Sequence, residues 1–383
     1  MSDAATRTTS TVTPVEPPRA VQRAAYADVP LYDPKRVPTA IDLSDNTNLW
    51  GLPPTAERTL RELAISRITR YPSLYAAELK AALAATAGVT PDMIVTGCGS
   101  DDVLDSAMRA FADPGALVAS STPTFAMVPI FARMNALRHV AIEEDATHVP
   151  DLEALAATGA DLLYLCAPNN PTGRMIPRDA LRRLLRTFPG VVILDEAYIE
   201  FAGADASHVP LLAESDRLLL VRTMSKAYGL AGMRVGYAIG APALVGEVEK
   251  SRGPYKVNAL AESVALAALQ HDREWVHEHV TLAIANRLRL EDELRAMGLS
   301  PIASSANFTC VPVSDCVAVG QAMRARGVAV RPFPALPHVG DTLRISVGPW
   351  PMVQAALDAL RSVLAERGPL RDTDTIAIPR GAA

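Results

Sequence analysis

Short apolar runs separated by amphipathic stretches constrain the fold of this chain more than any other feature. The runs are Met93–Val95, Ala116–Ala119, Leu162–Cys166, Val191–Leu194, Leu218–Val221 and Val235–Ile239. Each is short and β-rich or bounded by Gly, Pro or Asp, which is typical of strands buried on both faces. The segment from Leu181 to Phe188 has the i, i+3, i+4, i+7 spacing of a helix. This alternation predicts an α/β fold with a mostly parallel sheet between helices.

The pattern changes after about His271. A long charged helical segment runs through Glu291–Arg295, and a final helix is expected from about Pro351 to Glu366. Between them lie candidate strands at Asn307–Val313, Val328–Val330 and Leu343–Val347. We therefore expect a smaller α+β domain built from both chain ends, because 383 residues exceed one ordinary core.

The expected division of the chain follows from these patterns. Residues 26–70 form an N-terminal arm and part of the small domain, 71–270 the large domain and 271–368 the rest of the small domain. Residues 1–25 and 369–383 are expected to be disordered tails, since Met1–Ala20 is rich in Ser, Thr and Pro and lacks the apolar core of a secretory signal.

Composition excludes several classes of protein. Apolar residues make up 49% of the chain, yet no uninterrupted run approaches the roughly 20 residues of a membrane span. The net charge of −5 and the lack of a basic stripe argue against a nucleic-acid partner. The four cysteines form no CxxC pair and have no His at zinc-type spacing, so no metal site is expected. Free buried thiols indicate a reducing cytoplasm.

A lysine follows one predicted strand. Thr223, Ser225, Lys226 and Arg234 come after the run that ends at Val221, and ligands of open α/β sheets bind at the carboxyl ends of strands. A lysine beside apolar surface and a guanidinium has a lowered pKa and can act as a nucleophilic amine. Hydroxyls and one arginine suit a phosphate. Taken alone, such a lysine is far more often a surface lysine in a Gly-rich turn.

Three further strand ends carry polar groups. Asp195 ends the run from Val191, and a buried carboxylate needs a cation, although a helix N-cap is the simpler role for it. Asn170 lies in the turn N-N-P-T-G. Gly99, Ser100 and Asp101 open a helix whose free N–H groups can bind an anion, although many such turns bind nothing.

Taken together, these motifs resemble those of fold-type I aminotransferases that depend on pyridoxal 5′-phosphate (PLP). P-N-N-P-T-G at residues 168–173 is followed by D-E-A-Y at 195–198 and S-K-A-Y-G-L-A-G-M-R-V-G at 225–236. The separations are 25 residues from Asn170 to Asp195 and 31 from Asp195 to Lys226. The resemblance spans roughly residues 40–365 and implies PLP as the cofactor and a ping-pong transamination with 2-oxoglutarate as the usual acceptor.

The resemblance also implies a role for each matching residue. Lys226 is the lysine that holds the cofactor as a Schiff base and then moves the proton. Asp195 pairs with the pyridine nitrogen, and Asn170 and Tyr198 bind the ring oxygen. The ring of Phe125 stacks on the cofactor, and Arg344 binds the substrate α-carboxylate. The cofactor phosphate is bound by Gly99, Ser100, Asp101, Thr223, Ser225 and Arg234.

Within this family the sequence is most similar to histidinol-phosphate aminotransferases. The similarity lies in R-Y-P-S at 70–73, D-E-A-Y-I-E-F at 195–201, P-Y-K-V-N-A-L-A at 254–261 and G-V-A-V-R-P-F at 327–333. It implies that Tyr71 reaches the cofactor phosphate of the other subunit of a homodimer, and that Arg331 binds the substrate phosphate. Asn48 is expected on the substrate side.

The sequence departs from that pattern around the substrate. Asn46-Thr47-Asn48-Leu49 stands where N-E-N-P is usual, and Phe125 lacks the hydroxyl that some members use. Val128 stands where an aromatic is common. An aminotransferase for aromatic or specialised amino acids and a lyase like the threonine-phosphate decarboxylases therefore stay open as alternatives. A transcription regulator would need a DNA-binding domain, for which residues 1–40 are too short and too rich in proline.

Overall fold

The structure, a computed structural model, describes residues 23–27, 29–31, 37–203 and 205–367. The two expected tails lie outside these residues, except that residues 23–25 are described and 24–25 begin the short 3-10 helix η1 (Ala24–Tyr26). In the described part of the chain, no helix has the length and apolar composition needed to cross a membrane. All four cysteines are free, but only Cys166, Cys310 and Cys316 are buried as expected, whereas Cys98 is exposed.

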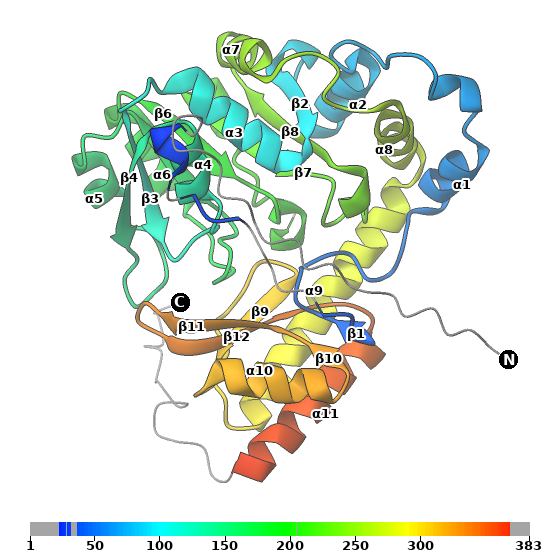
Figure 1. The fold of residues 1–383 in the computed structure, drawn as a ribbon, viewed down its shortest axis with the longest axis vertical. Coiled ribbons are helices and arrows are strands. Elements are labelled where there is room, and N and C mark those ends of the chain that lie inside the picture. The colour runs from blue at the N-terminus through cyan, green and yellow to red at the C-terminus, as the bar shows by residue number, and fades with distance from the viewer. Residues whose placement is uncertain (1–22, 28, 32–36, 204, 368–383) are drawn as a thin grey trace, which may run out of the picture.

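A seven-stranded sheet forms the larger part of the molecule, in the order β2-β8-β7-β6-β5-β3-β4 (Figure 1). Strands β7, β6, β5, β3 and β4 run parallel, whereas β8 is antiparallel to both β7 and β2. The α/β class predicted from the sequence is thus confirmed. The strands are β2 (Ile94–Cys98), β3 (Leu117–Thr122), β4 (Arg138–Glu143), β5 (Leu162–Cys166), β6 (Val191–Asp195), β7 (Leu218–Thr223) and β8 (Val235–Gly240).

Helices cover both faces of this sheet, and its central strands are therefore buried along their whole length. Every residue of β5, β7 and β8 is buried. One face packs against α3 (Gly99–Phe111), α4 (Val128–Met134) and α7 (Pro242–Arg252). The other face packs against α2 (Ala77–Ala87), α5 (Leu152–Ala157), α6 (Arg178–Thr187) and α8 (Ala259–His271). Burial on both sides explains why these strands have continuous apolar sequences.

The predicted runs differ from the observed strands mainly at the sheet edge. Strand β4 does not coincide with a predicted run because it is an edge strand with alternating exposure and contains Arg138, His139 and Glu143. The helix expected to open at about Ser100 begins at Gly99. The helix expected to include Phe188 ends at Thr187, and the backbone N–H of Phe188 caps it.

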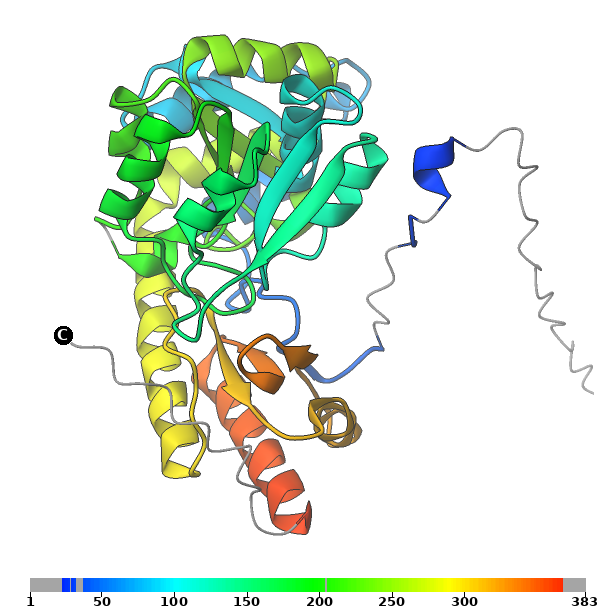
Figure 2. The ribbon, with the colours of Figure 1, turned by 90° about the vertical axis from the view of Figure 1, so that its left-hand side faces the viewer.

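A second, smaller body has its own core. It contains the antiparallel sheet β11-β12-β9 and the helices α10 (Cys316–Ala325) and α11 (Trp350–Arg367). The strands are β9 (Phe308–Pro312), β11 (Arg331–Leu336) and β12 (Gly340–Ser346). The long helix α9 (Arg273–Ala296) extends from the large body down the length of the small one (Figures 1 and 2). Its two ends thereby join the two cores.

Residues 26–70 divide between the two bodies. Strand β1 (Ile41–Asp42) pairs in parallel with β10 (Val328–Ala329) of the small body. Helix α1 (Pro54–Glu62) instead packs on the large body, where Ala56 is part of the core. The carboxylate of Asp272 accepts hydrogen bonds from the N–H groups of Thr55 and Ala56 at the start of α1. The chain segment between β1 and α1 therefore crosses from the small body to the large one.

Candidate active site

The carboxyl ends of the parallel strands bring the candidate residues to one edge of the large sheet. Asp195 ends β6, Thr223 ends β7, and Asn170 follows β5 after the turn. Because β8 runs in the opposite direction, Arg234 lies immediately before its first residue at the same edge. The pairing of the strands therefore brings residues that are far apart in the sequence together into one cluster.

Lys226 lies at the centre of this cluster. Its Nζ donates a hydrogen bond to the carbonyl oxygen of Asp45 at 3.1 Å and lies 5.6 Å from the centre of the Tyr198 ring. Burial, with a further contribution from the charge of Arg344, lowers the pKa of Lys226 to about 8. Near physiological pH the protonated form still predominates, but the neutral amine that a nucleophile requires is far more abundant than for an ordinary lysine.

Asp195 is a buried carboxylate with two donors. The hydroxyl of Tyr164 donates to Oδ2 at 2.9 Å, and the backbone N–H of Ala197 donates to Oδ1 at 3.0 Å. Burial raises the pKa of Asp195 to about 6 despite these bonds. A bound cation would lower that pKa again, so the site is suited to a protonated ring nitrogen.

Polar side chains from both bodies meet beside Lys226. The hydroxyl of Tyr198 accepts a hydrogen bond from Nδ2 of Asn46 at 3.1 Å, and burial raises the pKa of Tyr198 to about 12. Arg344, on β12, donates to Oδ1 of Asn170 and to the carbonyl oxygen of Ser44, both at 2.6 Å. Burial lowers the pKa of Arg344. Its Nε is buried without a hydrogen-bond partner.

The start of α3 forms a narrow cradle with the chain around Arg234. A Cβ on Gly99, whose φ is +81°, would lie 2.3 Å from Nη2 of Arg234. A Cβ on Gly236 would lie 2.1 Å from the backbone nitrogen of Ser100. The first N–H groups of a helix have no partner within the helix and carry partial positive charge. The two glycines therefore let a guanidinium and a helix N-terminus approach one another closely enough to share an anion.

The hydroxyls near this cradle are ordered by one another. Thr223 Oγ1 donates to Ser225 Oγ at 2.9 Å and accepts from the backbone N–H of Ser225 at 3.1 Å. Nη2 of Arg234 lies 3.4 Å from Asp101, and burial raises the pKa of that carboxyl. A reactive amine, a buried acid and an anion cradle at one sheet edge together fit PLP, which carries an aldehyde, a basic ring nitrogen and a phosphate.

Four candidate residues lie outside this group of contacts. Both polar atoms of the Asn48 side chain bind backbone, at Ala227 and Trp50, which favours a structural role. Phe125 is half-buried and packs against the core on the α3 side of the sheet. Arg331 is the cross-strand partner of Arg344. Tyr71 is 83% exposed, and its ring stacks on Tyr255 with 4.8 Å between centroids.

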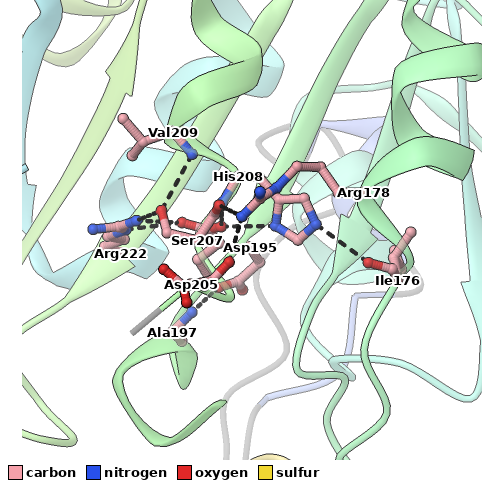
Figure 3. A network of polar contacts seen from close by, with 10 residues as sticks. Ile176, Arg178, Asp195, Ala197, Asp205, Ser207, His208, Val209 and Arg222 are labelled. Carbon is pink, nitrogen blue, oxygen red and sulfur yellow. Dashed lines mark hydrogen bonds and ion pairs between the residues drawn. The ribbon is translucent and has the colours of Figure 1, made fainter. Parts of the chain in front are cut away.

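Sequence reasoning did not identify a buried network behind Asp195 (Figure 3). The carboxylate of Glu196 pairs with Arg222 at 2.7 Å and accepts from the backbone N–H of His208 at 2.8 Å. Nε2 of His208 lies 3.2 Å from the carbonyl oxygen of Ile176. The network thus ties the loop after Asn170 to β6 and β7. The acidic residue directly after Asp195 was the available signal, but its partners come from distant segments.

Comparison with known proteins agrees with this geometry. The family model for aminotransferase class I and II matches residues 38–360. Histidinol-phosphate aminotransferase of Methylibium petroleiphilum is 38% identical over 336 residues, which cover 85% of this chain and 90% of that protein. The corresponding protein of Methylobacillus flagellatus is 35% identical over 332 residues, with coverage of 85% and 89%.

Solved structures show the same relationship. The histidinol-phosphate aminotransferase of Sinorhizobium meliloti, crystallised in complex with pyridoxal-5′-phosphate, superposes with a TM-score of 0.78 at 27% identity. The match covers 86% of this chain and 92% of that one. The chain therefore belongs to the class I and II aminotransferases and is a PLP-dependent aminotransferase.

Proposed function

We propose that this aminotransferase transfers the amino group of L-histidinol phosphate to 2-oxoglutarate. The single observation that carries the proposal is the pair of arginines on β11 and β12. Arg331 and Arg344 are Cα partners across the two strands, and the charge of Arg331 contributes to lowering the pKa of Arg344. Among the described residues, the side chain of Arg331 has no hydrogen-bond or ion-pair partner. The charge of Asp45 acts on Arg344 but neither arginine is ion-paired among the described residues, and two neighbouring cations of this kind favour substrates that carry anions.

We assign the chemistry to residues of the cluster. The bound cofactor supplies an aldehyde and an electron-withdrawing ring. Lys226 holds it and then carries the proton, since its amine has a pKa of about 8 and lies in a buried site. Asp195 keeps the ring nitrogen protonated, while Asn170 and Tyr198 orient the ring oxygen. Arg344 binds the carboxylate of the 2-oxo acid through its guanidinium fork.

Binding of the cofactor phosphate is assigned to the α3 cradle. The N–H groups of Gly99, Ser100 and Asp101 and the guanidinium of Arg234 converge there, with the Thr223 and Ser225 hydroxyls nearby. Phe125 lies in the loop after β3 and is proposed to stack on the ring. Asn48, whose amide is bound internally, would act on the substrate side only by shaping the backbone.

A coupled assay with 2-oxoglutarate tests the substrate. Histidinol phosphate, histidinol, tyrosine, phenylalanine and threonine phosphate are compared in the wild type and in Arg331→Ala. We expect the wild type to prefer the phosphorylated amine and Arg331→Ala to lose roughly tenfold to a hundredfold in kcat/KM for histidinol phosphate but little for histidinol. Equal rates with histidinol phosphate and histidinol would refute the proposal that the phosphorylated amine is the substrate. Release of carbon dioxide from threonine phosphate without a 2-oxo acid would instead identify a lyase.

We further propose that the enzyme is a homodimer with shared active sites. Large apolar side chains are exposed on one stretch of chain and on a second segment beside it, namely Ile65, Ile68, Tyr71, Leu74, Tyr75 and Tyr255. The stacking of Tyr71 on Tyr255 joins the two segments into one patch, and a patch of this kind favours association with another protein surface. A second copy of the chain would cover it and bring Tyr71 to the partner's cofactor phosphate.

Mixing two inactive variants tests the shared site. Tyr71→Ala removes the side chain that is proposed to act in the partner, and Lys226→Ala removes the amine. A mixed dimer then contains one site with both residues, so we expect activity to return on mixing. Neither variant alone should recover. Failure to regain activity while sedimentation shows mixed dimers would contradict the shared site.

A further inference from the structure

Tyr164 is a tyrosine whose hydroxyl points at the candidate acid from inside the sheet. It lies in β5, is 0% exposed, and is the Cα partner of Ile193 in β6. Cys166, two residues further along β5, is the partner of Asp195. Side chains two residues apart share a face of the sheet, so the long phenol reaches diagonally to Asp195. The hydroxyl donates to Oδ2 at 2.9 Å.

The direction of this hydrogen bond is fixed by its surroundings. Burial raises the pKa of Tyr164 well above its usual range, and the negative charge of Asp195 acts in the same direction. The phenol therefore remains a neutral donor at any pH at which the enzyme works. Its bond lowers the pKa of Asp195, opposing the larger effect of burial. The N–H of Ala197 occupies the other carboxylate oxygen.

Other groups around Asp195 act by charge and not by a direct bond. Asp101, on α3, raises the pKa of Asp195, whereas Lys226 lowers it. The thiol of Cys166 donates to the carbonyl oxygen of Pro168, whereas the hydroxyl of Tyr164 donates to the carboxylate of Asp195. A charged lysine would compete with a cation for Asp195, but a neutral phenol fixes the carboxylate without competing.

We propose that Tyr164 is a positioning residue that keeps Asp195 ionised and oriented for the protonated ring nitrogen of PLP. The proposal rests on the role of Asp195 in the proposed function. A carboxylate oxygen accepts more than one hydrogen bond, so the bond from Tyr164 leaves room for the ring N–H. A phenylalanine at this position would fill the same space and remove only the donor.

Tyr164→Phe is compared with Tyr237→Phe, a matched control. Tyr237 lies in β8, is also buried, and its hydroxyl interacts with the buried charge of Arg222. Both variants lose a buried phenol that serves a charged group, so their loss of stability should be similar. We expect only Tyr164→Phe to weaken PLP binding, with a rise in Kd of about tenfold, because it loses a hydrogen bond to a charged group that holds the cofactor in the proposed function. Equal affinities in the two variants would overturn the proposal.

A double-mutant cycle locates the effect at Asp195. In an Asp195→Asn background, Tyr164→Phe should change the Kd for PLP by less than about twofold, because the carboxylate charge to which the Tyr164 hydroxyl donates is absent. An undiminished tenfold effect in that background would mean that Tyr164 acts elsewhere. If the wild type binds no PLP, the proposed function fails, whereas normal wild-type binding with a silent Tyr164→Phe refutes the role of Tyr164 alone.

A measurement on the cofactor-free protein covers the case in which Tyr164→Phe does not fold. Site-specific 3-fluorotyrosine at position 164 keeps the shape of the ring and makes the hydroxyl a stronger donor. The carboxyl carbon of Asp195, assigned by its loss in Asp195→Asn, is titrated by carbon NMR. We expect its midpoint to fall relative to unmodified protein, and an unchanged midpoint would overturn the proposal.

Discussion

Gly236→Ala should distort the proposed cofactor cradle without replacing any residue that is proposed to bind the cofactor. Gly236 lies in β8, opposite Gly97 of β2. A Cβ there would lie 2.1 Å from the nitrogen of Ser100 and 2.2 Å from the carbonyl carbon of Gly99, where ordinary contact begins at 3.4 Å. These are backbone atoms that no rotamer change can move away. The first turn of α3 must therefore shift by about an ångström relative to Arg234.

The size of the effect follows from that shift. Overpacking of a well-packed core costs about 1–3 kcal/mol, which should appear as a loss of unfolding free energy in the cofactor-free protein. A displacement of roughly 1 Å at a binding site can cost on the order of a hundredfold. We expect the Kd for PLP, measured by absorbance titration, to rise roughly tenfold to a hundredfold.

Gly246→Ala is the control for Gly236→Ala. Gly246 lies in α7, and a Cβ there meets no atom within 4 Å. Alanine should stabilise this helix by roughly 0.5–1 kcal/mol and leave the Kd for PLP unchanged. If Gly236→Ala binds PLP as tightly as Gly246→Ala, then the close approach of β8 to α3 does not shape the cradle, and the reasoning is refuted.

Three further predictions concern buried charges. The folded-state pKa of Asp195, about 6, lies above the unfolded value of about 3.9, so this residue contributes stability that is complete below pH 4 and lost as pH rises through 6. The unfolding free energy of cofactor-free Asp195→Asn should therefore exceed that of the wild type by about 3 kcal/mol at pH 7 but not at pH 4, and a difference independent of pH would contradict this. The rate at which cofactor-free protein captures PLP should rise with pH and level off above about pH 8, the pKa of Lys226; a rate still rising toward pH 10 would contradict the lowered pKa. Glu196→Gln should lower the free energy of unfolding in chemical denaturation by about 3–5 kcal/mol because buried Arg222 then loses the carboxylate with which it is paired, and wild-type stability would show that the pair is dispensable.

The sequence predicted those features that depend on neighbouring residues. The runs at 162–166 and 191–194 revealed β5 and β6 because a strand buried on both faces needs apolar residues at every position. Lys226, Asp195 and Asn170 could be predicted as candidates because each lies in a short motif that follows a strand. Edge strand β4 was not found, since one-sided exposure removes the continuous apolar signal.

Contacts between distant residues could not be predicted in the same way. The bond from Tyr164 to Asp195 depends on the register of β5 against β6, and the bond from Asn46 to Tyr198 depends on how the N-terminal segment crosses the site. The residues adjacent to Glu196 in the sequence do not indicate that Arg222 and His208 are its partners.

The amino-acid order by itself determined the strand and helix pattern, the motifs and the family resemblance, because these are properties of short segments. Tertiary structure alone decided which donor meets which carboxylate, how deeply Lys226 and Asp195 are buried, and hence their pKa values of about 8 and about 6. The physical reason is that burial and hydrogen bonding depend on groups brought together from distant parts of the chain, and local sequence patterns carry no record of them.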